Sequence, residues 1–415
     1  MKAEQPGSYE EAAELLRAAS ADGRTVRFRG GGTKFGWGRA GPETDLELCT
    51  GGLDRVLEHN AGDFTAVLQA GVPLAVAQAA LASAGQQLAL DPPLSPWGGA
   101  GDDAAIEATD AGATIGGIVA TNDSGPLRHR YGGVRDLVVG VTVILSDGTI
   151  ARAGGKVIKN VAGYDLGKLF AGAYGTLGMI AEVTVRLHPV PPRTATVVAR
   201  SADPAALAAA AAALMHAPLE ADSLDLWWDS ATPEGAVLVR FASADPAPRA
   251  EEATALLRRL GGVDDTTVRA SVTTGVSKER TVDLDVDTED EPRWEAQRRA
   301  QRSDVVVKVS ALPAALPAVL AAAQALGGTM VARAGLGLAW VQLPLLPAGG
   351  MVEAIGELRR RVAPAPAVVL DAPGEVRAAL DPWGLETGPV ELMRKVKERF
   401  DPAGICAPGL FVGGI

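Results

Sequence analysis

The most constraining feature of the sequence is a stretch of small residues from Gly112 to Gly125, Gly-Ala-Thr-Ile-Gly-Gly-Ile-Val-Ala-Thr-Asn-Asp-Ser-Gly. Four of its residues are glycine, and three polar side chains stand near its end. Glycine lets another group approach the main chain closely, so this stretch presents backbone to its neighbour. The polar end offers hydrogen-bond partners to a flat heteroaromatic ligand. A tight turn with a glycine-rich strand would explain the same residues.

Composition limits what the chain can be. Its 415 residues exceed what one hydrophobic core supports, so we expect two domains. A net charge of −11 disfavours a broad nucleic-acid surface, so phosphate binding has to be local. Cys49 and Cys406 form no CxxC pair and the four histidines form no HxxxH or HxH pattern, which predicts no metal site. No membrane-spanning apolar run and no signal pattern is found, so we expect a cytoplasmic protein.

A second glycine-rich stretch, Arg29-Gly-Gly-Gly-Thr-Lys34, directly follows a predicted strand. Three successive glycines can turn their N–H groups to one side and form an anion nest. The flanking Arg29, Thr33 and Lys34 add two charges and a hydroxyl, which together suit a pyrophosphate. The spacing is neither the dinucleotide motif GxGxxG nor a Walker loop, which argues against a Rossmann NAD dehydrogenase. A plain surface loop is the alternative interpretation.

A third stretch repeats glycine every three residues, at Gly172, Gly175 and Gly178. Alone, it is typical of a turn between a helix and a strand. Beside the two other glycine stretches, it predicts a third wall of one elongated site. All three depend on bare backbone, so we expect them to share one groove.

Periodicity and end signals predict helices and strands along the whole chain. Ser8 and Glu11 form a capping box for a helix that Gly23 ends, and Asp147-Gly148 closes a hairpin. Beyond residue 193, the elements fit an antiparallel sheet with helices on one face. The acidic run Asp283–Glu291 is expected to be a solvated loop rather than a metal site. The predicted strands are 25–29, 45–48, 65–69, 137–145, 180–187, 194–200, 223–228, 236–241, 305–309, 330–333 and 338–343, and the predicted helices are 9–20, 73–84, 204–216, 249–260, 313–326, 351–362 and 390–400.

The order of five motifs resembles the PCMH-type FAD-binding domain of the vanillyl-alcohol oxidase family, and within it the glycolate oxidase FAD-binding subunits. The resemblance covers about residues 5–193 and the tail 400–409. It implies an α+β fold with a two-lobed FAD-binding domain, 1–193, to which the tail 381–415 returns. It also implies an antiparallel-sheet α+β cap or substrate domain, 194–380. The motifs are Arg29–Thr33, Asp91-Pro-Pro93, Gly112–Gly125, Lys159–Asp165 and Gly175–Gly178.

The resemblance also implies where FAD lies. Gly30–Thr33 would hold the pyrophosphate, Asp91, Pro92 and 114–124 would line the ribityl and isoalloxazine parts, and 175–180 would lie near the adenine. Some relatives attach FAD to a histidine at the position of Thr33, so this threonine predicts non-covalent FAD. The predicted cofactor-binding residues are Arg29, Gly30, Gly31, Gly32, Thr33, Lys34, Asp91, Pro92, Thr114, Ile115, Gly116, Gly117, Thr121, Asn122, Ser124, Gly175, Gly178 and Ile180.

Residues for acid–base chemistry are few. Oxidation of a 2-hydroxy acid needs a base for the hydroxyl proton and a cation or metal for the carboxylate. Beyond residue 193 the only histidine is His216, which fits a cation at a helix C-terminus better than a base. His129, Arg130 and Tyr131 are the remaining candidates, and the catalytic residues stay unassigned.

The resemblance implies an FAD-dependent oxidoreductase, with the FAD-binding subunit of a glycolate oxidase-like 2-hydroxy acid dehydrogenase complex as its nearest model. A second flavin subunit and an iron–sulfur subunit are the implied partners. Because this chain has no cluster-ligand cysteine motif, the iron–sulfur relay has to lie in another chain. Two alternatives stay open: a non-catalytic scaffold subunit that keeps the flavin fold, and a stand-alone flavin oxidase or dehydrogenase of another substrate.

Overall fold

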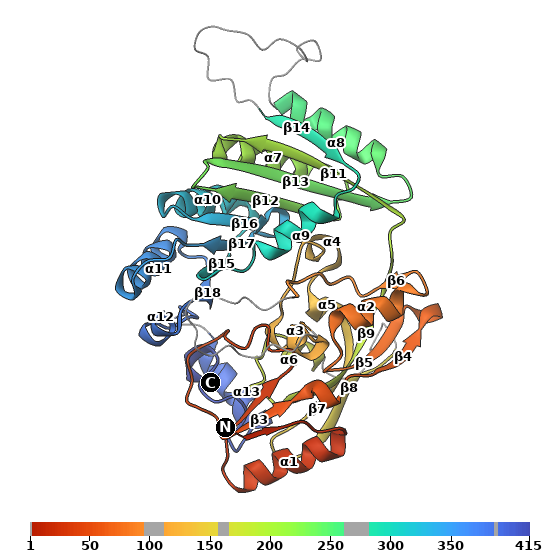
Figure 1. The fold of residues 1–415 in the computed structure, drawn as a ribbon, viewed down its shortest axis with the longest axis vertical. Helices are drawn as coiled ribbons and strands as arrows, with labels where there is room; N and C mark the ends of the chain where they lie inside the picture. Colours follow the sequence, from red (N-terminus) through yellow and green to blue (C-terminus); the bar gives the residue numbers. More distant parts are fainter. Residues whose placement is uncertain (1, 95–111, 157–165, 261–281, 386–388) are drawn as a thin grey trace. The chain divides into compact units, whose positions relative to one another are not determined.

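The chain divides into two compact units, Met1–Val190 together with Val369–Ile415, and Pro191–Val368. The computed structural model describes residues 2–94, 112–156, 166–260, 282–385 and 389–415 (Figure 1). Both units combine helices with sheets, and this confirms the predicted α+β fold class. The predicted loop 94–110, apart from Leu94, and the motif Lys159–Asp165 lie outside the described residues.

The first lobe of the first unit is a small parallel sheet with one helix packed on it. Ser8 accepts a hydrogen bond from the backbone N–H of Glu11, as the predicted capping box requires, and the helix begins at the next residue. Its buried face joins the strands in one hydrophobic cluster. The sheet order is β1-β3-β2, formed by β1 (Lys2–Glu4), β3 (Leu46–Cys49) and β2 (Val26–Arg29), with helix α1 (Tyr9–Ala21).

The second lobe is an antiparallel five-stranded sheet with a separate core. Small apolar side chains on one face of the sheet pack against short helices, which contain much of the glycine-rich sequence. The sheet order is β4-β5-β9-β7-β8, formed by β4 (Val56–Asn60), β5 (Thr65–Gln69), β9 (Met179–Arg186), β7 (Val138–Ile144) and β8 (Ile150–Gly154). The helices are α2 (Leu74–Ala82), α3 (Ile115–Thr121), α4 (Arg128–Tyr131), α5 (Val134–Leu137) and α6 (Gly167–Phe170), and a short ribbon pairs β6 (Gln86–Gln87) with β10 (His188–Pro189).

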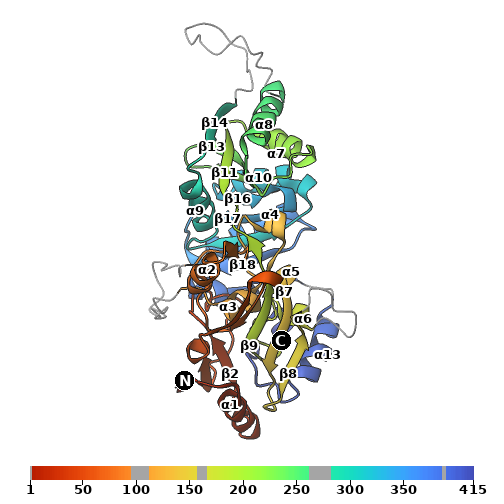
Figure 2. The same ribbon diagram turned by 90° about the vertical axis from the view of Figure 1, so that its right-hand side faces the viewer.

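The C-terminal segment is part of the first unit and pairs with its N-terminal sheet. The backbone of Val26 donates to Ile405 O at 2.8 Å and accepts from Ala407 N at 2.7 Å. Lys397, on helix α13 (Val390–Phe400), donates to Thr176 O at 2.7 Å and lies 2.5 Å from Asp401. Figure 2 shows α13 beside α6, far from it in sequence, and the Phe170 and Phe400 rings meet edge to face at 5.6 Å. The tail is therefore tied to the unit by backbone pairing, charge and packing.

The second unit is built on one eight-stranded sheet made of two similar halves. Each half runs strand–helix–strand–strand–helix–strand, and its first strand lies between its third and fourth. The halves meet where their second strands pair antiparallel. The sheet order is β14 (Asp283–Asp287), β11 (Arg193–Ser201), β13 (Glu234–Ser243), β12 (Ser223–Asp229), β16 (Thr329–Arg333), β17 (Leu338–Gln342), β15 (Val306–Ser310) and β18 (Ala367–Asp371), the last of which leads out of this unit.

Helices cover both faces of this sheet, which corrects the prediction of a single helical layer. α7 (Pro204–His216), α8 (Ala247–Leu260), α10 (Leu316–Ala325) and α11 (Ala348–Val362) form one layer (Figure 1). α9 (Glu291–Arg299), inserted between the two halves, packs on the opposite face through the fully buried Trp294. α9 was not predicted from the sequence, because its mostly polar residues show no apolar stripe apart from Trp294.

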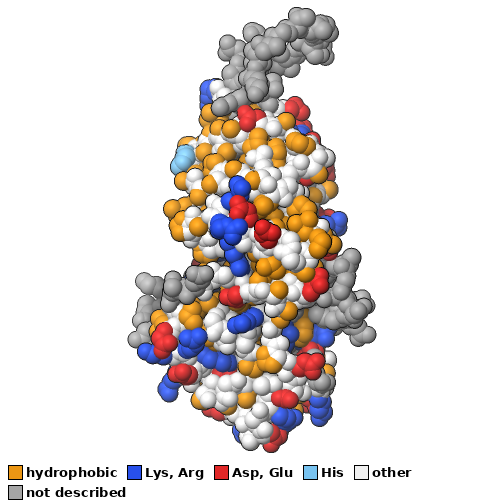
Figure 3. Space-filling view, turned by 90° about the vertical axis from the view of Figure 1, so that its left-hand side faces the viewer, with side chains coloured by type: hydrophobic (Ala, Val, Ile, Leu, Met, Phe, Trp, Pro, Cys, Tyr) orange, Lys and Arg blue, Asp and Glu red, His pale blue; other side chains and the backbone are white. Residues whose placement is uncertain are grey.

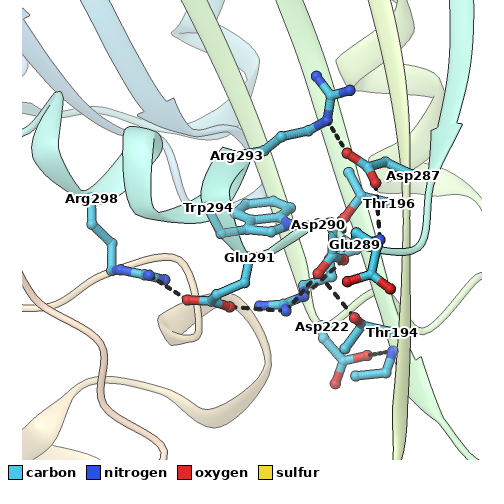
Figure 4. A network of polar contacts seen from close by, with 12 residues as sticks. Thr194, Thr196, Asp222, Asp287, Glu289, Asp290, Glu291, Arg293, Trp294 and Arg298 are labelled. Atoms are coloured by element: carbon cyan, nitrogen blue, oxygen red, sulfur yellow. Dashed lines mark hydrogen bonds and ion pairs between the residues drawn. The ribbon is translucent and has the colours of Figure 1, made fainter.

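The acidic run Asp283–Glu291 is not a solvated loop, which corrects a second prediction. Its first part is the edge strand β14, and alternating carboxylates on such an edge block further strand pairing. Asp290 is buried and accepts hydrogen bonds from Thr194 at 2.9 Å and from Thr196 at 2.7 Å (Figure 4). Arg240 also donates to Asp290 through two nitrogens, at 2.8 and 3.1 Å. The run therefore fastens α9 to the sheet.

Basic, acidic and hydrophobic side chains are interspersed on the face drawn in Figure 3. The described residues visible there form no continuous basic area of the size that a nucleic-acid duplex would need. No helix among the described residues is long and apolar enough to cross a membrane.

Candidate functional site: a groove between two glycine stretches

Two of the three glycine stretches meet backbone to backbone in the first unit. β2 ends at Arg29, and the chain then turns through Gly30–Gly32. A Cβ atom built on Gly30 would overlap Thr114 Oγ1, and one built on Gly31 would overlap the carbonyl oxygen of Gly112. Any side chain at either position would push the two stretches apart. The glycines are therefore required by this close approach, and not only by turn geometry.

The stretch of small residues from Gly112 to Gly125 contains the short helix α3. Thr114 is the N-cap of α3, and its Oγ1 accepts from the N–H of Gly117 at 3.4 Å. Thr121 Oγ1 donates to Gly117 O at 2.8 Å. Gly116 faces inward, where an added Cβ would lie 2.6 Å from the Cβ of Ala70. Thr114, Gly117 and Thr121 line the groove, whereas the buried Ile115 and Gly116 belong to the core side of the helix.

The groove between these stretches has a volume of about 90 Å³. That volume suits a single phosphate-sized group and takes in only part of a dinucleotide. Its lining combines bare backbone, hydroxyls, guanidiniums and aromatic rings. The lining residues are Arg27, Phe28, Arg29, Gly30, Gly31, Gly32, Thr33, Lys34, Phe35, Trp37, Ala113, Thr114, Gly117, Ile118, Ala120, Thr121, Tyr174 and Leu410.

Lys34 is buried and ion-paired. Its ammonium lies 3.1 Å from an Asp123 carboxylate oxygen, and both side chains are less than a tenth exposed. The same ammonium donates to Pro93 O at 3.0 Å and to Thr33 Oγ1 at 3.3 Å. This pair joins the Gly30–Gly32 turn to the chain that follows α3. Because the two residues are far apart in sequence, the sequence placed Asp123 in the cofactor-lining stretch 114–124 but did not predict its pairing with Lys34.

Arg27 was also not predicted, yet it lines the groove beside Arg29. Successive residues of a strand face opposite sides, so Arg27 and Arg29 of β2 share one face. The guanidinium of Arg29 pairs with Glu47 at 3.2 Å. That of Arg27 donates to the backbone oxygen of Phe35 and lies over the Phe35 ring at 3.7 Å. Burial, reinforced by the charge of Arg377, lowers the pKa of Arg27 to about 10.

The third glycine stretch contributes one side chain to the groove. Tyr174 lines it from a left-handed backbone conformation, at φ 55°, and packs edge to face on Trp383 at 5.1 Å. Burial and the nearby acidic groups Asp123 and Asp371 raise the pKa of Tyr174, so its hydroxyl is protonated at neutral pH. Gly175 and Gly178 pack inside the unit instead, where added Cβ atoms would lie 2.9 Å from the Phe28 ring and 2.7 Å from Ile144 O, and Ile180 is buried in β9.

Four further predicted residues support the chain around α3 and are not among the groove-lining residues. Asp91 accepts a hydrogen bond from the N–H of Leu127 at 3.0 Å, and the neighbouring Pro92 is buried. Asn122, left-handed at φ 51°, ends α3. Its Oδ1 is buried and has no hydrogen-bond partner among the described residues. Ser124 Oγ accepts from Arg128 at 3.2 Å.

The three catalytic candidates lie on α4 and are not among the groove-lining residues. The Tyr131 ring packs against the His188 ring at 4.6 Å. Burial, and then the charge of Arg130, lowers the pKa of His129, so its imidazole is neutral at pH 7. His129 Nδ1 is buried and has no hydrogen-bond partner in the described part of the chain. The described residues include no group of three histidine, cysteine or acidic side chains able to hold a metal ion.

Comparison with known proteins finds FAD-linked relatives of this chain. A model described as "FAD binding domain" matches residues 3–102 and 104–154, and one described as "FAD linked oxidases, C-terminal domain" matches 380–410. The glycolate oxidase subunit GlcE of Escherichia coli (strain K12) is 35% identical over 180 residues, 43% of this chain and 46% of that protein. D-2-hydroxyglutarate dehydrogenase of Xanthomonas citri pv. viticola is 33% identical over 187 residues, 45% of this chain and 36% of that protein.

The fold has a solved counterpart along nearly its whole length. Alkyldihydroxyacetonephosphate synthase superposes with a TM-score of 0.64 over 97% of this chain and 76% of that one, at 16% identity. That identity is low enough that the likeness shows the fold alone. The match to an FAD-binding domain and the FAD-linked relatives give FAD as the cofactor, and the fold is consistent with a PCMH-type flavoprotein. The chain contains an FAD-binding domain and a C-terminal segment of FAD-linked oxidases, and it is homologous to glycolate oxidase subunits, which confirms the resemblance found in its sequence. It spans about half the length, or less, of the curated relatives it matches.

Proposed function

We propose that this chain is the FAD-binding subunit of a complex that oxidises 2-hydroxy acids, as a glycolate oxidase does. The observation that carries the proposal is the groove in which Gly30 and Gly31 pack on Gly112 and Thr114 and are flanked by guanidiniums. Such a lining fits a pyrophosphate, because backbone N–H groups and cations are its usual partners. FAD would lie in the unit Met1–Val190 with Val369–Ile415, and the unit Pro191–Val368 would be the substrate domain.

The proposed division of roles follows the chemistry of the residues. FAD, when bound, supplies the hydride and electron chemistry, and the protein supplies binding and orientation. Gly30–Gly32 and Thr33 would hold the pyrophosphate, and Thr114, Gly117 and Thr121 would line the path of the cofactor. Thr33 offers no side chain for the histidyl bond found in some relatives, so the cofactor would be non-covalent. Trichloroacetic acid should leave the flavin in the supernatant, whereas yellow precipitated protein would contradict this.

His129 is the proposed proton acceptor for the substrate hydroxyl. A neutral imidazole can take up a proton, and His129 is held in that neutral form by its lowered pKa. Replacing His129 with Gln should slow flavin reduction by the preferred 2-hydroxy acid by about 100-fold or more while leaving bound FAD unchanged. Unchanged reduction of the His129→Gln variant would remove this residue from the mechanism.

The proposed partners are a second flavin subunit and an iron–sulfur subunit, supported by relatives that are themselves named as glycolate oxidase subunits. The described residues offer no metal-ligand cluster for electron relay, so the relay is assigned to another chain. We expect the purified chain alone to oxidise glycolate poorly with an artificial acceptor. Rapid multiple-turnover oxidation by the single chain would favour a stand-alone enzyme.

A cytoplasmic location stays a prediction, and cell fractionation tests it.

A second candidate is a scaffold subunit that keeps FAD without catalysing a reaction. The favouring observation is that the groove-lining residues include no histidine and no carboxylate. Anaerobic mixing with a panel of 2-hydroxy acids separates the two functions, first with the chain alone and then with its co-purified partners. Bleaching of this chain's flavin by one of the acids supports the enzyme. A flavin that dithionite reduces but no acid reduces, with or without partners, supports the scaffold.

A further inference from the structure

Arg27 is a groove-lining cation that no glycine motif accounts for. It follows the fully buried Val26 and precedes Phe28, whose ring packs against Gly175, so β2 fixes its position from both sides. Its one hydrogen bond to a described residue runs to the backbone oxygen of Phe35, and its flat face covers the Phe35 ring. The ring and the carbonyl together hold the guanidinium in one orientation at the groove.

The charges around Arg27 are unbalanced at that point. No carboxylate of the described residues lies within ion-pairing distance of Arg27, whereas its neighbour Arg29 pairs with Glu47 at 3.2 Å. A second guanidinium, that of Arg377 on helix α12 (Gly374–Ala379), approaches the same turn, where an added Cβ on Gly36 would lie 3.0 Å from it. A half-buried cation beside like charges is costly unless an anion accompanies it. The lowered pKa of Arg27 has the same causes: burial, Arg377 and Arg29 lower it, and the carboxylate of Glu47, which pairs with Arg29, offsets them only in part.

We propose that Arg27 binds a phosphate of the FAD pyrophosphate, opposite the backbone N–H groups of Gly30–Gly32. This inference rests on the proposed function, since it assumes that FAD lies in the groove. An arginine presents a planar fork of N–H donors that matches two phosphate oxygens, and the Phe35 carbonyl occupies only part of that fork. Arg27 would therefore be a cofactor-binding residue on β2, in addition to the glycine turn.

The test compares FAD affinity in apo-forms of the full chain by quenching of flavin fluorescence. The variants are Arg27→Leu, Arg27→Lys and the control Arg24→Leu, which removes a partly exposed arginine paired with Asp22 just before β2. We expect the FAD dissociation constant to rise about 10-fold or more in Arg27→Leu, less in Arg27→Lys, and less than twofold in the control. Added salt should weaken FAD binding to the wild type more than to Arg27→Leu, because one charge–phosphate contact is gone.

If Arg27 instead had a structural role, Arg27→Leu would melt at a lower temperature than the wild type and would bind FAD with an unchanged salt dependence. We expect the apo-form of Arg27→Leu to melt at the same temperature as the wild type or above it, because a repelled, partly desolvated charge has been removed. An FAD dissociation constant within twofold of the wild type would overturn the proposal. So would a lower melting temperature with an unchanged salt dependence of FAD binding. If Arg27→Leu does not fold, Arg27→Gln decides by the same measurements. Wild-type protein that binds no FAD would instead overturn the proposed function itself.

Discussion

At the scale of single residues, the groove depends on a buried charge pair as much as on its glycines. Lys34 and Asp123 are far apart in sequence but meet at 3.1 Å in the interior. The sequence predicted Lys34 as a cofactor cation because it follows a glycine turn. In the structure, a carboxylate accompanies its charge, and Arg27 faces the groove without one among the described residues. Strand alternation could have identified Arg27, since it stands two residues before Arg29.

Removing the acid of this pair should destabilise the first unit. Asp123→Asn leaves the Lys34 ammonium buried without its counter-charge, and breaking a buried pair in this way costs about 3–5 kcal/mol. Urea unfolding of the apo-protein, followed by circular dichroism, measures the change. The matched control is Glu58→Gln, which breaks a more exposed pair with Lys156 and should cost about 0–1 kcal/mol. An equal loss of unfolding free energy in both variants would mean that the buried pair stabilises the protein no more than the exposed pair does.

At the scale of elements, the C-terminal segment is held by Asp401. Its carboxylate accepts from Ile405 N at 3.2 Å and Cys406 N at 2.8 Å, and it pairs with Lys397. Burial by itself would raise the pKa of Asp401, but the hydrogen bond and charge of Lys397 outweigh it and hold that pKa below its ordinary value. A carboxylate with a lowered folded-state pKa contributes stability above its unfolded pKa and loses it as the pH falls through the folded one.

The pH dependence of unfolding should therefore differ between the wild type and Asp401→Asn. At pH 7 we expect the variant to lose about 2–4 kcal/mol of unfolding free energy, because Lys397 and two N–H groups lose their acceptor. The difference should shrink below about pH 4, as the Asp401 carboxylate takes up a proton first in the unfolded and then in the folded wild type. Chemical denaturation at pH 7, 5 and 3 measures it. A difference that stays constant down to pH 3 would contradict the assigned role.

Helix α9 offers a second prediction at this scale. Asp290 receives hydrogen bonds from two threonines and Arg240, so Asp290→Ala should lower the unfolding free energy of the second unit by about 3–5 kcal/mol. The next residue provides the control, because Glu291 is 61% exposed and Glu291→Gln should cost at most about 1 kcal/mol. Differential scanning calorimetry on both variants tests this. Similar melting of Asp290→Ala and the wild type would show that α9 is held by Trp294 alone.

At the scale of the whole molecule, the sequence was informative where its signals are local. Alternation and end signals predicted strands such as Thr65–Gln69 and helices such as Pro204–His216 with the bounds that the structure has. β14 was missed because its acidic sequence looks solvated, and α9 because its mostly polar residues show no apolar stripe. The residues that bury Asp290 between them, Thr196 and Arg240, are distant in sequence. The duplicated topology of the second unit was missed because its halves share element order and no motif.

The kind of site could be predicted from the sequence, but the role of several of its residues could not. Glycine stretches predicted a backbone-lined groove, and the first two stretches do meet in one. Gly175 and Gly178 instead accommodate Phe28 and Ile144, a packing role that glycine spacing cannot distinguish from ligand binding. Whether each predicted residue contacts FAD stays a prediction. The family resemblance identified the cofactor as FAD. The residues alone indicated only a ligand with a pyrophosphate and a flat ring.

The most direct test of the account is the visible absorbance spectrum of the purified chain beside those of Gly31→Ala and Gly62→Ala. An added Cβ at position 31 would overlap the Gly112 carbonyl oxygen, whereas none of the described atoms lies within 4 Å of one at position 62. We predict flavin bands, with FAD released on denaturation, in the wild type and Gly62→Ala, and their loss in a folded Gly31→Ala. A colourless wild type, or a Gly31→Ala variant that keeps one FAD per chain, would contradict the central claim.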